Sequence, residues 1–354
     1  VDDARETILR EVRPLAPLEL PLAEAAGCVL AYDATAEEDV PPYTQATVEG
    51  LAVRASDIRI ATQAAPVELR VVGDVTASGA PEATVGWGES VRVAAGAILP
   101  AGADCVVPLD WCTLDGSVVR VRKAAHEDAN VRRAGADVRA GQVLVPAGRR
   151  LQAPELALLA GAGYPMALAH PRLRVAVLSV GNLVEPGRPT SFGATRDAGS
   201  FALIGALREA GAVPHRIGIV QSEAALRNVL LENTARADCF VCVGIAASDG
   251  GELLPGLPGV GFLEAAMYPT SGIAFGFVEE VPFFGLPASP VPLFTEFEVF
   301  VRPAVLRIMG RRDIHRPKVN AVLDRSLRGP VGLSLLVPAR VAHRDGAWHA
   351  EPAS

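Results

Sequence analysis

The spacing of apolar residues changes along the chain, and each spacing predicts a different kind of element. Residues 3–13 place Ala4, Ile8 and Val12 at helical spacing, which predicts an amphipathic helix. Between about residues 66 and 136, short apolar runs alternate with Gly, Pro and Asp turns, and no helical pattern interrupts them. This second pattern predicts a compact β-domain.

From residue 171 to about residue 312, apolar runs alternate with helical patterns. The run VAVLSVG at 175–181 lacks polar alternation, which is typical of a strand buried on both faces of a parallel sheet. Helical patterns at 199–210 and 222–236 separate it from further strands, and this alternation predicts right-handed crossovers. Ligands of such sheets bind at the carboxyl ends of the strands. The turn at Gly181 is therefore the first candidate site.

These patterns predict an α/β multi-domain fold. Residues 1–39 and 137–170 form a discontinuous linker and dimerisation domain with helical and β elements, and residues 40–136 form a β-rich domain. Residues 171–312 form the central α/β domain on a mostly parallel sheet, and residues 313–354 form a partial C-terminal β-domain.

Composition narrows the possible partners. Apolar residues make up 50% of the 354 residues and charged residues only 21%, so long disorder is not expected. The net charge is −7 and no basic stripe occurs, which argues against nucleic acid and favours a small molecule or a protein partner. No apolar stretch is long enough to span a membrane, and the charged N-terminal segment does not resemble a signal peptide. We therefore expect a cytoplasmic protein.

The five cysteines do not suggest a disulfide framework, because their number is odd and they are scattered. Cys239 and Cys242 form a C-x-x-C, but they lie within the apolar run CFVCVG. Residues three apart on a strand point to opposite faces and cannot jointly grip a metal. We therefore expect both to be small core residues.

Five motifs follow one another along the chain. They read EEDVPPYTQATVEGLAVRASD, AAGAILPAGADCVVPLD, NVRRAGADVRAGQVLVPAGRRLQAPELALLAGAG, VAVLSVGNLVEPG and FFGLPASPV. Their order and spacing resemble the molybdopterin molybdenumtransferase family, the bacterial MoeA-type proteins related to the last domain of gephyrin. The resemblance extends over about residues 5–312 and makes this chain a divergent member.

The resemblance implies a defined chemistry. Enzymes of this family take adenylylated molybdopterin and molybdate, hydrolyse the adenylyl group with Mg²⁺, and insert molybdenum into the dithiolene. It also implies a four-domain homodimer whose cleft lies between the α/β domain of one subunit and the β-domain of the other. Phosphates favour glycine-rich turns and helix N-termini, Mg²⁺ favours carboxylates, and molybdate favours cationic donors.

Matching positions of this chain supply the candidate site. The resemblance assigns catalysis to Glu49 and Asp137. It assigns Mg²⁺ binding to Asp197, Asp249 and Glu252. It assigns binding of the pterin to Ser179, Gly181, Asn182, Gly244, Ser248, Pro287 and Ser289.

Simpler roles remain open for the acids among these residues. Asp137 lies in GADVRAG and fits a turn in which the carboxylate bonds its own backbone. Asp197 precedes the helical pattern 199–210 and fits a helix cap. Asp249 and Glu252 flank two glycines and fit a flexible, solvated turn.

Several positions depart from the family pattern. The family's loop D-V-P-x-F-D-N-S-A-M-D-G-Y-A-V carries two acids that appear here as Thr44 and Glu49. The basic motif K-P-G-K-P appears as YPTSG at 268–272, without either lysine. Arg54 and Arg196 are candidates to compensate for the missing positive charge. Losing these partners makes burial of an unpaired dianion costly.

Two functions of different classes follow from this mixture of retained and lost positions. In the first, the chain is a molybdopterin molybdenumtransferase-like enzyme of molybdenum cofactor biosynthesis, with impaired catalysis. In the second, it is a catalytically inactive, gephyrin-like dimeric scaffold that binds a protein partner. A weaker third alternative is a carrier that binds a pterin or nucleotide without turnover.

Overall fold

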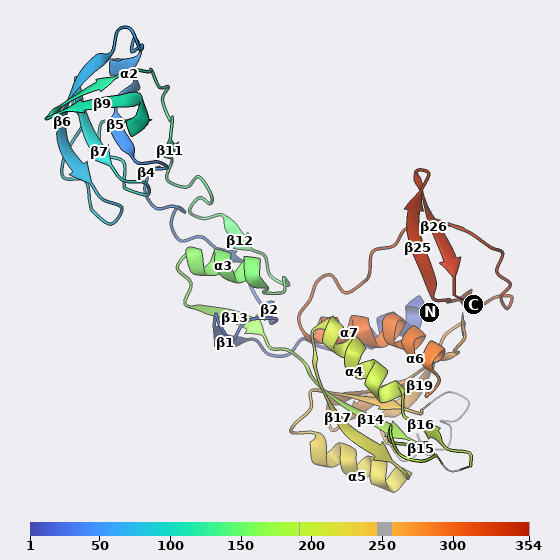
Figure 1. Cartoon of the computed structure of the whole chain (residues 1–354). Coiled ribbons are helices and arrows are strands. Elements are labelled where there is room, and N and C mark those ends of the chain that lie inside the picture. The colour runs from blue at the N-terminus through green and yellow to red at the C-terminus, as the bar shows by residue number, and fades with distance from the viewer. Residues whose placement is uncertain (191, 246–256, 354) are drawn as a thin grey trace. The chain divides into compact units, whose positions relative to one another are not determined.

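The computed structural model describes residues 1–190, 192–245 and 257–353 (Figure 1). The chain divides into two compact units by its internal contacts. The first unit comprises residues 1–32, 146–156 and 165–354, and the second comprises residues 33–145 and 157–164.

The second unit is built on a six-stranded sheet with the order β8-β5-β7-β6-β10-β9. Its strands are β5 (Gly50–Val53), β6 (Val67–Val75), β7 (Glu89–Val93), β8 (Cys105–Pro108), β9 (Cys112–Asp115) and β10 (Val118–Val121). Strands β6 and β7 are parallel, and the other neighbours are antiparallel. Helix α2 (Ala55–Ile58) and a 3₁₀ turn (Leu109–Trp111) complete the sheet region. The strands predicted between residues 66 and 136 are confirmed.

Alternating side chains give this sheet two apolar faces. Leu51 and Val53 of β5 belong to one buried cluster, and Ala52 between them belongs to another. Two short antiparallel pairs extend the unit. They join β4 (Gln45–Ala46) to β11 (Val131–Arg132), and β3 (Ala34–Thr35) to β12 (Val143–Val145).

The first unit contains the α/β sheet, with the order β17-β14-β18-β22-β21-β19. Its strands are β14 (Arg174–Val180), β17 (Val213–Val220), β18 (Cys239–Val243), β19 (Val260–Glu264), β21 (Gly272–Val278) and β22 (Val281–Leu286). The first four strands in the sheet order are mutually parallel. Strand β21 is antiparallel to β22, and β19 is antiparallel to β21 and so runs in the same direction as the first four. The predicted mostly parallel sheet is therefore confirmed.

Helices cover both faces of this sheet. Its helices are α1 (Asp2–Glu11), α4 (Gly199–Ala210), α5 (Glu223–Asn233), α6 (Pro290–Glu296) and α7 (Arg302–Ile308), with a π-helical segment (Phe297–Val301) joining α6 to α7. Figure 1 shows α4 and α7 on one side of the sheet and α5 on the other. Leu203 of α4 and Leu226 of α5 accordingly belong to different buried clusters.

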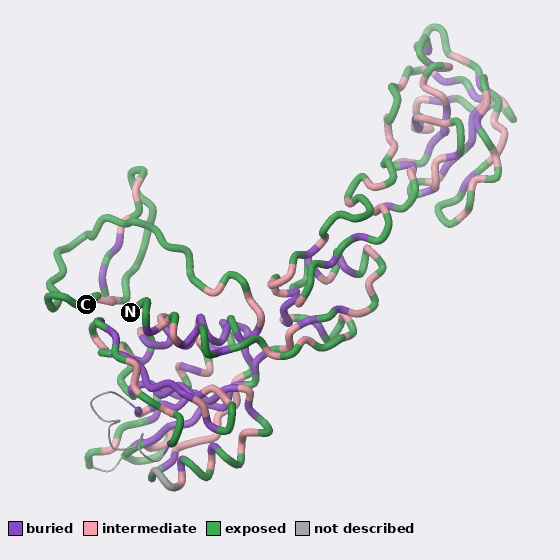
Figure 2. Tube along the Cα trace, turned by 180° about the vertical axis from the view of Figure 1, so that it is seen from behind, coloured by how far each residue is buried: buried purple, intermediate pink, exposed green. Residues whose placement is uncertain are grey.

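The paired cysteines of β18 lie on opposite faces of the sheet, as the strand period requires. Cys239 belongs to the cluster beneath α4, and Cys242 belongs to the cluster beneath α5. All five cysteines are buried and free, and burial raises the pKa of Cys112 to about 11. The prediction of small core residues is confirmed. Figure 2 shows that the central strands of this unit are largely buried.

Shorter elements complete the first unit. A three-stranded sheet joins β1 (Leu18–Pro21), β13 (Met166–His170) and β2 (Val29–Leu30). Helix α3 (Ala153–Gly161) begins beside Pro154 and crosses from the first unit into the second. The remaining strands are β15 (Leu183–Val184), β16 (Thr195–Arg196), β20 (Met267–Tyr268), β23 (Ala321–Leu323), β24 (Ser334–Leu335), β25 (Ala339–Arg344) and β26 (Ala347–Pro352). None of the described helices has the length and apolar character needed to cross a membrane.

Candidate functional site

The carboxyl ends of three parallel strands meet at one edge of the α/β sheet. Ser179 of β14 lies opposite Val243 of β18, and Val243 lies opposite Leu286 of β22. The backbone N–H groups of Gly244 and Ile245 both donate to the carbonyl oxygen of Leu286, at 2.8 and 2.9 Å. The segments that follow these strands therefore lie side by side. They carry the predicted binding residues Gly181, Asn182, Gly244, Pro287 and Ser289.

Two glycines allow this close packing at the edge. Gly244 has φ +96°, and a Cβ there would lie 2.1 Å from the carbonyl oxygen of Val180. A Cβ on Gly199, the first residue of α4, would lie 2.7 Å from Cγ1 of Val243. The N-terminus of α4 therefore approaches the end of β18 closely. Backbone N–H groups at such a position favour anionic ligands.

An open hollow of about 640 Å³ lies at the same edge of the sheet. Glu264, at the end of β19, and Ser271, just before β21, contribute to its lining. Glu264 pairs with Gly272, which places the hollow beside the segment that lacks the two lysines of the family pattern. The residues that line it are Phe262, Glu264, Ala265, Ala266 and Ser271.

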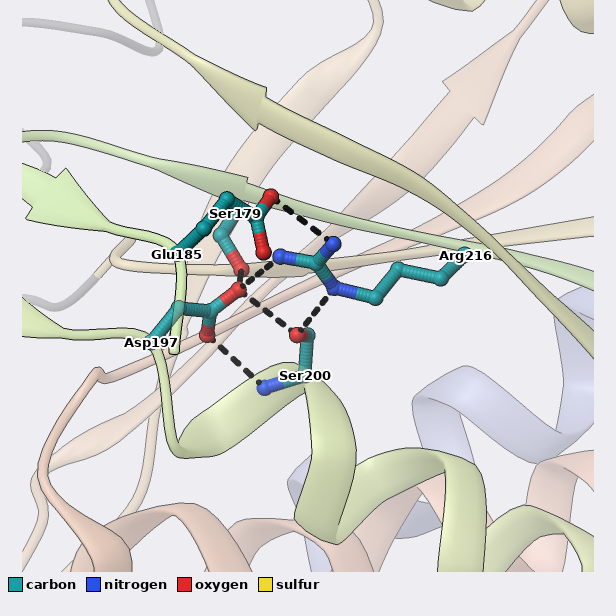
Figure 3. A network of polar contacts seen from close by, with 5 residues as sticks. All are labelled: Ser179, Glu185, Asp197, Ser200 and Arg216. Atoms are coloured by element: carbon teal, nitrogen blue, oxygen red, sulfur yellow. Dashed lines mark hydrogen bonds and ion pairs between the residues drawn. The ribbon is translucent and has the colours of Figure 1, made fainter. Parts of the chain in front are cut away.

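Asp197 is the centre of a buried polar network beside this edge (Figure 3). Its Oδ2 accepts hydrogen bonds from Ser179 Oγ at 2.9 Å, Ser200 Oγ at 2.6 Å and Arg216 Nη2 at 2.7 Å. Its Oδ1 accepts the backbone N–H of Ser200 at 3.1 Å. The carboxylate therefore ties β14, the first turn of α4 and β17 together.

Hydrogen bonds keep Asp197 ionised although it is buried. Burial by itself would raise the pKa of this carboxyl group, but hydrogen bonds from Ser200, Arg216 and Ser179 outweigh that effect. The pKa of Asp197 is consequently held below its ordinary value. The bond to Ser200 N–H in the first turn of α4 matches the capping role that was the alternative for Asp197.

Arg216 is the residue of this network that the sequence analysis missed. Its Nη1 contacts Glu185 Oε1 at 2.9 Å, and its Nε donates to Ser200 Oγ at 2.7 Å. The guanidinium also lies over the ring of Phe201, with Cζ 4.8 Å from the centroid. A charged residue inside the strand pattern HRIGIV was the available signal, because an arginine within a strand of a buried sheet requires an acidic partner.

The other predicted metal ligands are not placed by the structure. Asp249 and Glu252 lie outside the described residues, as does the predicted binding residue Ser248. Within residues 1–190, 192–245 and 257–353, no group of three or more His, Cys, Asp or Glu side chains is arranged to hold a metal ion.

The two predicted catalytic residues belong to the second unit, and each is paired with its own arginine. Glu49 immediately precedes β5 and contacts Arg92 at 3.2 Å, with 57% of its side chain exposed. Asp137 forms an ion pair with Arg132, and the hydrogen bond and charge of that arginine lower the pKa of Asp137. Both carboxylates are therefore partly exposed, and each already has a cationic partner.

The loop of the first family motif is fastened by its neighbours in the second unit. Asp39 Oδ1 accepts the backbone N–H of Ala140 at 2.9 Å. The carbonyl oxygen of Val40 accepts the N–H of Asp137 at 3.0 Å, and the Val40–Pro41 bond is cis. These contacts hold Asp137 beside this loop.

The two arginines considered as substitutes for the lost lysines lie in different units. Arg196 is exposed at the end of β16 in the first unit. Arg54 lies in the second unit, where its guanidinium is 5.5 Å from the ring centroid of Trp87. Arg196 therefore lies in the same unit as the carboxyl edge.

Comparison with known proteins gives matches along nearly the whole chain. A family model described as the MoeA N-terminal region (domain I and II) matches residues 1–163. Molybdopterin molybdenumtransferase 2 of Mycobacterium tuberculosis is 32% identical over 360 residues, which cover 98% of this chain and 88% of the relative. Molybdopterin molybdenumtransferase 1 of the same organism is 35% identical over 328 residues, which cover 86% of this chain and 77% of the relative.

A solved structure supports the same relationship. The molybdopterin biosynthesis MoeA protein from Pyrococcus horikosii has a TM-score of 0.81 and 29% identity with this chain. The alignment covers 100% of this chain and 89% of that protein. The similarity therefore includes both units and is not limited to one of them.

Proposed function

This chain belongs to the molybdopterin molybdenumtransferase (MoeA) family and functions in molybdenum cofactor biosynthesis, and on that premise we propose that it transfers molybdenum from molybdate to adenylylated molybdopterin. The observation that carries the proposal is the 32% identity with a molybdenumtransferase over 98% of this chain. The proteins compared above carry the names of molybdenumtransferases and molybdopterin biosynthesis proteins. None of them supports the scaffold alternative.

The carboxyl edge of the α/β sheet supplies the chemistry for binding the pterin phosphate. The backbone N–H groups of Gly181 and Gly244 already donate to the carbonyl oxygens of Val220 and Leu286, so the candidate phosphate donors at this edge are exposed side chains. Asn182 is exposed there, and its amide can donate to a phosphate oxygen. Ser289, exposed just before α6, makes no capping hydrogen bond with its side chain, so its hydroxyl is available to a ligand.

Mg²⁺ does not fit the donors present at Asp197. A divalent cation needs free carboxylate lone pairs, but Oδ2 of Asp197 already accepts three hydrogen bonds. One of these donors is the cationic Arg216. We therefore propose that any Mg²⁺ bound by this protein is held by residues other than Asp197.

The proposal is tested by product formation. Purified protein is incubated with adenylylated molybdopterin and molybdate, and released AMP and pterin-bound molybdenum are measured. We expect both to exceed a heat-inactivated control. Absence of both products would refute the proposed transfer.

A single substitution tests the role of the edge in that reaction. Asn182→Ala removes an exposed amide without disturbing a buried group, so we expect a roughly tenfold lower rate with an unchanged melting temperature. Glu232→Gln is the matched control, because Glu232 is exposed near the end of α5, away from the carboxyl edge. Equal rates for both variants would exclude Asn182 from the site.

We also propose that the protein is a homodimer, which the resemblance implies, and that it works in the cytoplasm. Light scattering after size-exclusion chromatography should give about twice the chain mass of 36.9 kDa. A mass of one chain at micromolar concentration would contradict the dimer.

A further inference from the structure

We propose that the guanidinium of Arg216 is a built-in counter-cation that occupies the place beside Asp197 where the resemblance implies Mg²⁺. Asp197 is then a positioning residue of the α/β unit and not a metal ligand. This inference concerns metal binding and local order, so it stands or falls separately from the proposed transfer reaction.

The coordination of Asp197 leaves no room for a metal ion. Three donors from Ser179, Ser200 and Arg216 surround Oδ2, at 2.9, 2.6 and 2.7 Å. The side chain is 0% exposed. A magnesium ion at about 2.1 Å from Oδ2 would have to displace at least one of these donors, and one at Oδ1 would compete with the N–H of Ser200. In either position its water ligands would have to enter a buried site.

The charges in the network are already balanced by the protein itself. Arg216 lies between Asp197 and Glu185, with Nη2 and Nη1 at 2.7 and 2.9 Å from their oxygens. The ring of Phe201 contacts the guanidinium, and only 18% of the arginine side chain is exposed. A second cation here would be repelled by a fixed positive charge in a medium of low dielectric constant.

The same contacts position the loop that follows β14. Glu185 comes just after β15, and Asp197 comes just after β16, whose Thr195 N–H donates to the carbonyl oxygen of Asn182 at 3.2 Å. Arg216 on β17 binds both acids. The arginine thereby binds both ends of the 185–197 segment. The predicted binding residue Asn182 lies three residues before this segment and is tied to it by the hydrogen bond from Thr195.

Mn²⁺ titration followed by electron paramagnetic resonance tests the inference without turnover. We expect wild type and Asp197→Asn to bind the same number of Mn²⁺ ions. Arg216→Met should bind one additional ion between the two released carboxylates, and Arg216→Met/Asp197→Asn should lose it. Arg216→Lys keeps the charge and should bind as wild type does.

Two results would overturn the inference. The first is a loss of one Mn²⁺ on Asp197→Asn in the presence of Arg216, because that ion must then bind at Asp197. The second is a folded Arg216→Met with no additional ion. If Arg216→Met does not fold by circular dichroism, the comparison of wild type with Asp197→Asn and Arg216→Lys decides the matter.

Discussion

The buried carboxyl groups of Asp197 and Glu296 differ in their ionisation state. Asp197 is ionised because four hydrogen bonds reach it. Glu296, on α6, is only 4% exposed, and burial raises its pKa to about 9. It is therefore protonated and neutral at pH 7. The family resemblance offered no reason to single out Glu296, and its burial is evident only in the folded chain.

The raised pKa of Glu296 predicts a pH-dependent stability. The folded state holds this proton up to about pH 9, whereas the unfolded chain releases it near the ordinary glutamate pKa of 4.5. The contribution of Glu296 to the free energy of unfolding is therefore fully present below about pH 4.5 and declines as pH rises towards 9. Glu296→Gln should remove the decline, which amounts to about 2–4 kcal/mol between pH 5 and pH 8.

Urea unfolding at several pH values measures this effect. Glu232→Gln serves as the control, because that side chain is exposed and its substitution should leave the pH profile of wild type unchanged. If the free energy of unfolding changes with pH in the same way for wild type and Glu296→Gln, Glu296 is ionised in the folded protein.

Removing Asp197 should be far more costly than removing Glu185. Asp197→Ala leaves the guanidinium of Arg216 without its buried partner and should cost about 3–5 kcal/mol. Glu185 is 42% exposed, so Glu185→Ala should cost less than about 1 kcal/mol. Because the pKa of Asp197 is lowered on folding, its contribution is present above about pH 4 and is lost as pH falls further. Equal costs for the two variants at pH 7 would contradict the network.

At the scale of elements, the carboxyl edge depends on close backbone approach. Strands β14, β18 and β22 end together, and Gly244 turns the chain immediately after β18. At the N-terminus of α5, Ser222 Oγ accepts the N–H of Ala225 at 3.3 Å and so caps the helix.

Two glycine substitutions separate steric need from helix propensity. Gly244→Ala brings a Cβ within 2.1 Å of a carbonyl oxygen at φ +96° and should cost more than about 2 kcal/mol. Gly205, within α4, has no atom within 4 Å of a Cβ, so Gly205→Ala should stabilise by about 0.5–1 kcal/mol. Thermal unfolding measures both, and a tolerated Gly244→Ala would contradict the crowding after β18.

At the scale of the whole molecule, each described apolar cluster lies within one unit. Leu203 belongs to a cluster of the first unit and Leu51 to a cluster of the second. None of the four described apolar clusters draws on both units. Each unit therefore has the apolar core that cooperative unfolding requires.

Calorimetry tests this division. Leu51→Ala and Leu203→Ala each open a cavity at a fully buried site and should cost about 2–5 kcal/mol. We expect two unfolding transitions, with each variant lowering the temperature of a different one. A single transition lowered by both variants would show that the units unfold together.

Much of the fold could be predicted from local patterns. The strand at 175–181, the helix at 199–210 and the opposite placement of Cys239 and Cys242 all follow from the spacing of nearby residues. The site was predictable only in part. Gly181, Gly244 and Pro287 reach one edge because parallel strands must end together, but nothing local connects Arg216 with Asp197.

The sequence by itself determined the periodicities, the family and the edge at which ligands are expected, because these depend on neighbouring residues and on motifs with fixed order. Only the tertiary structure decided that the carboxylate of Asp197 pairs with Arg216, which is 19 residues away in the chain. That pairing requires β17 to lie beside β14, where Arg216 is opposite Val177. Strand register and side-chain burial are set by the packing of the whole sheet, and they determine which charged side chains form ion pairs.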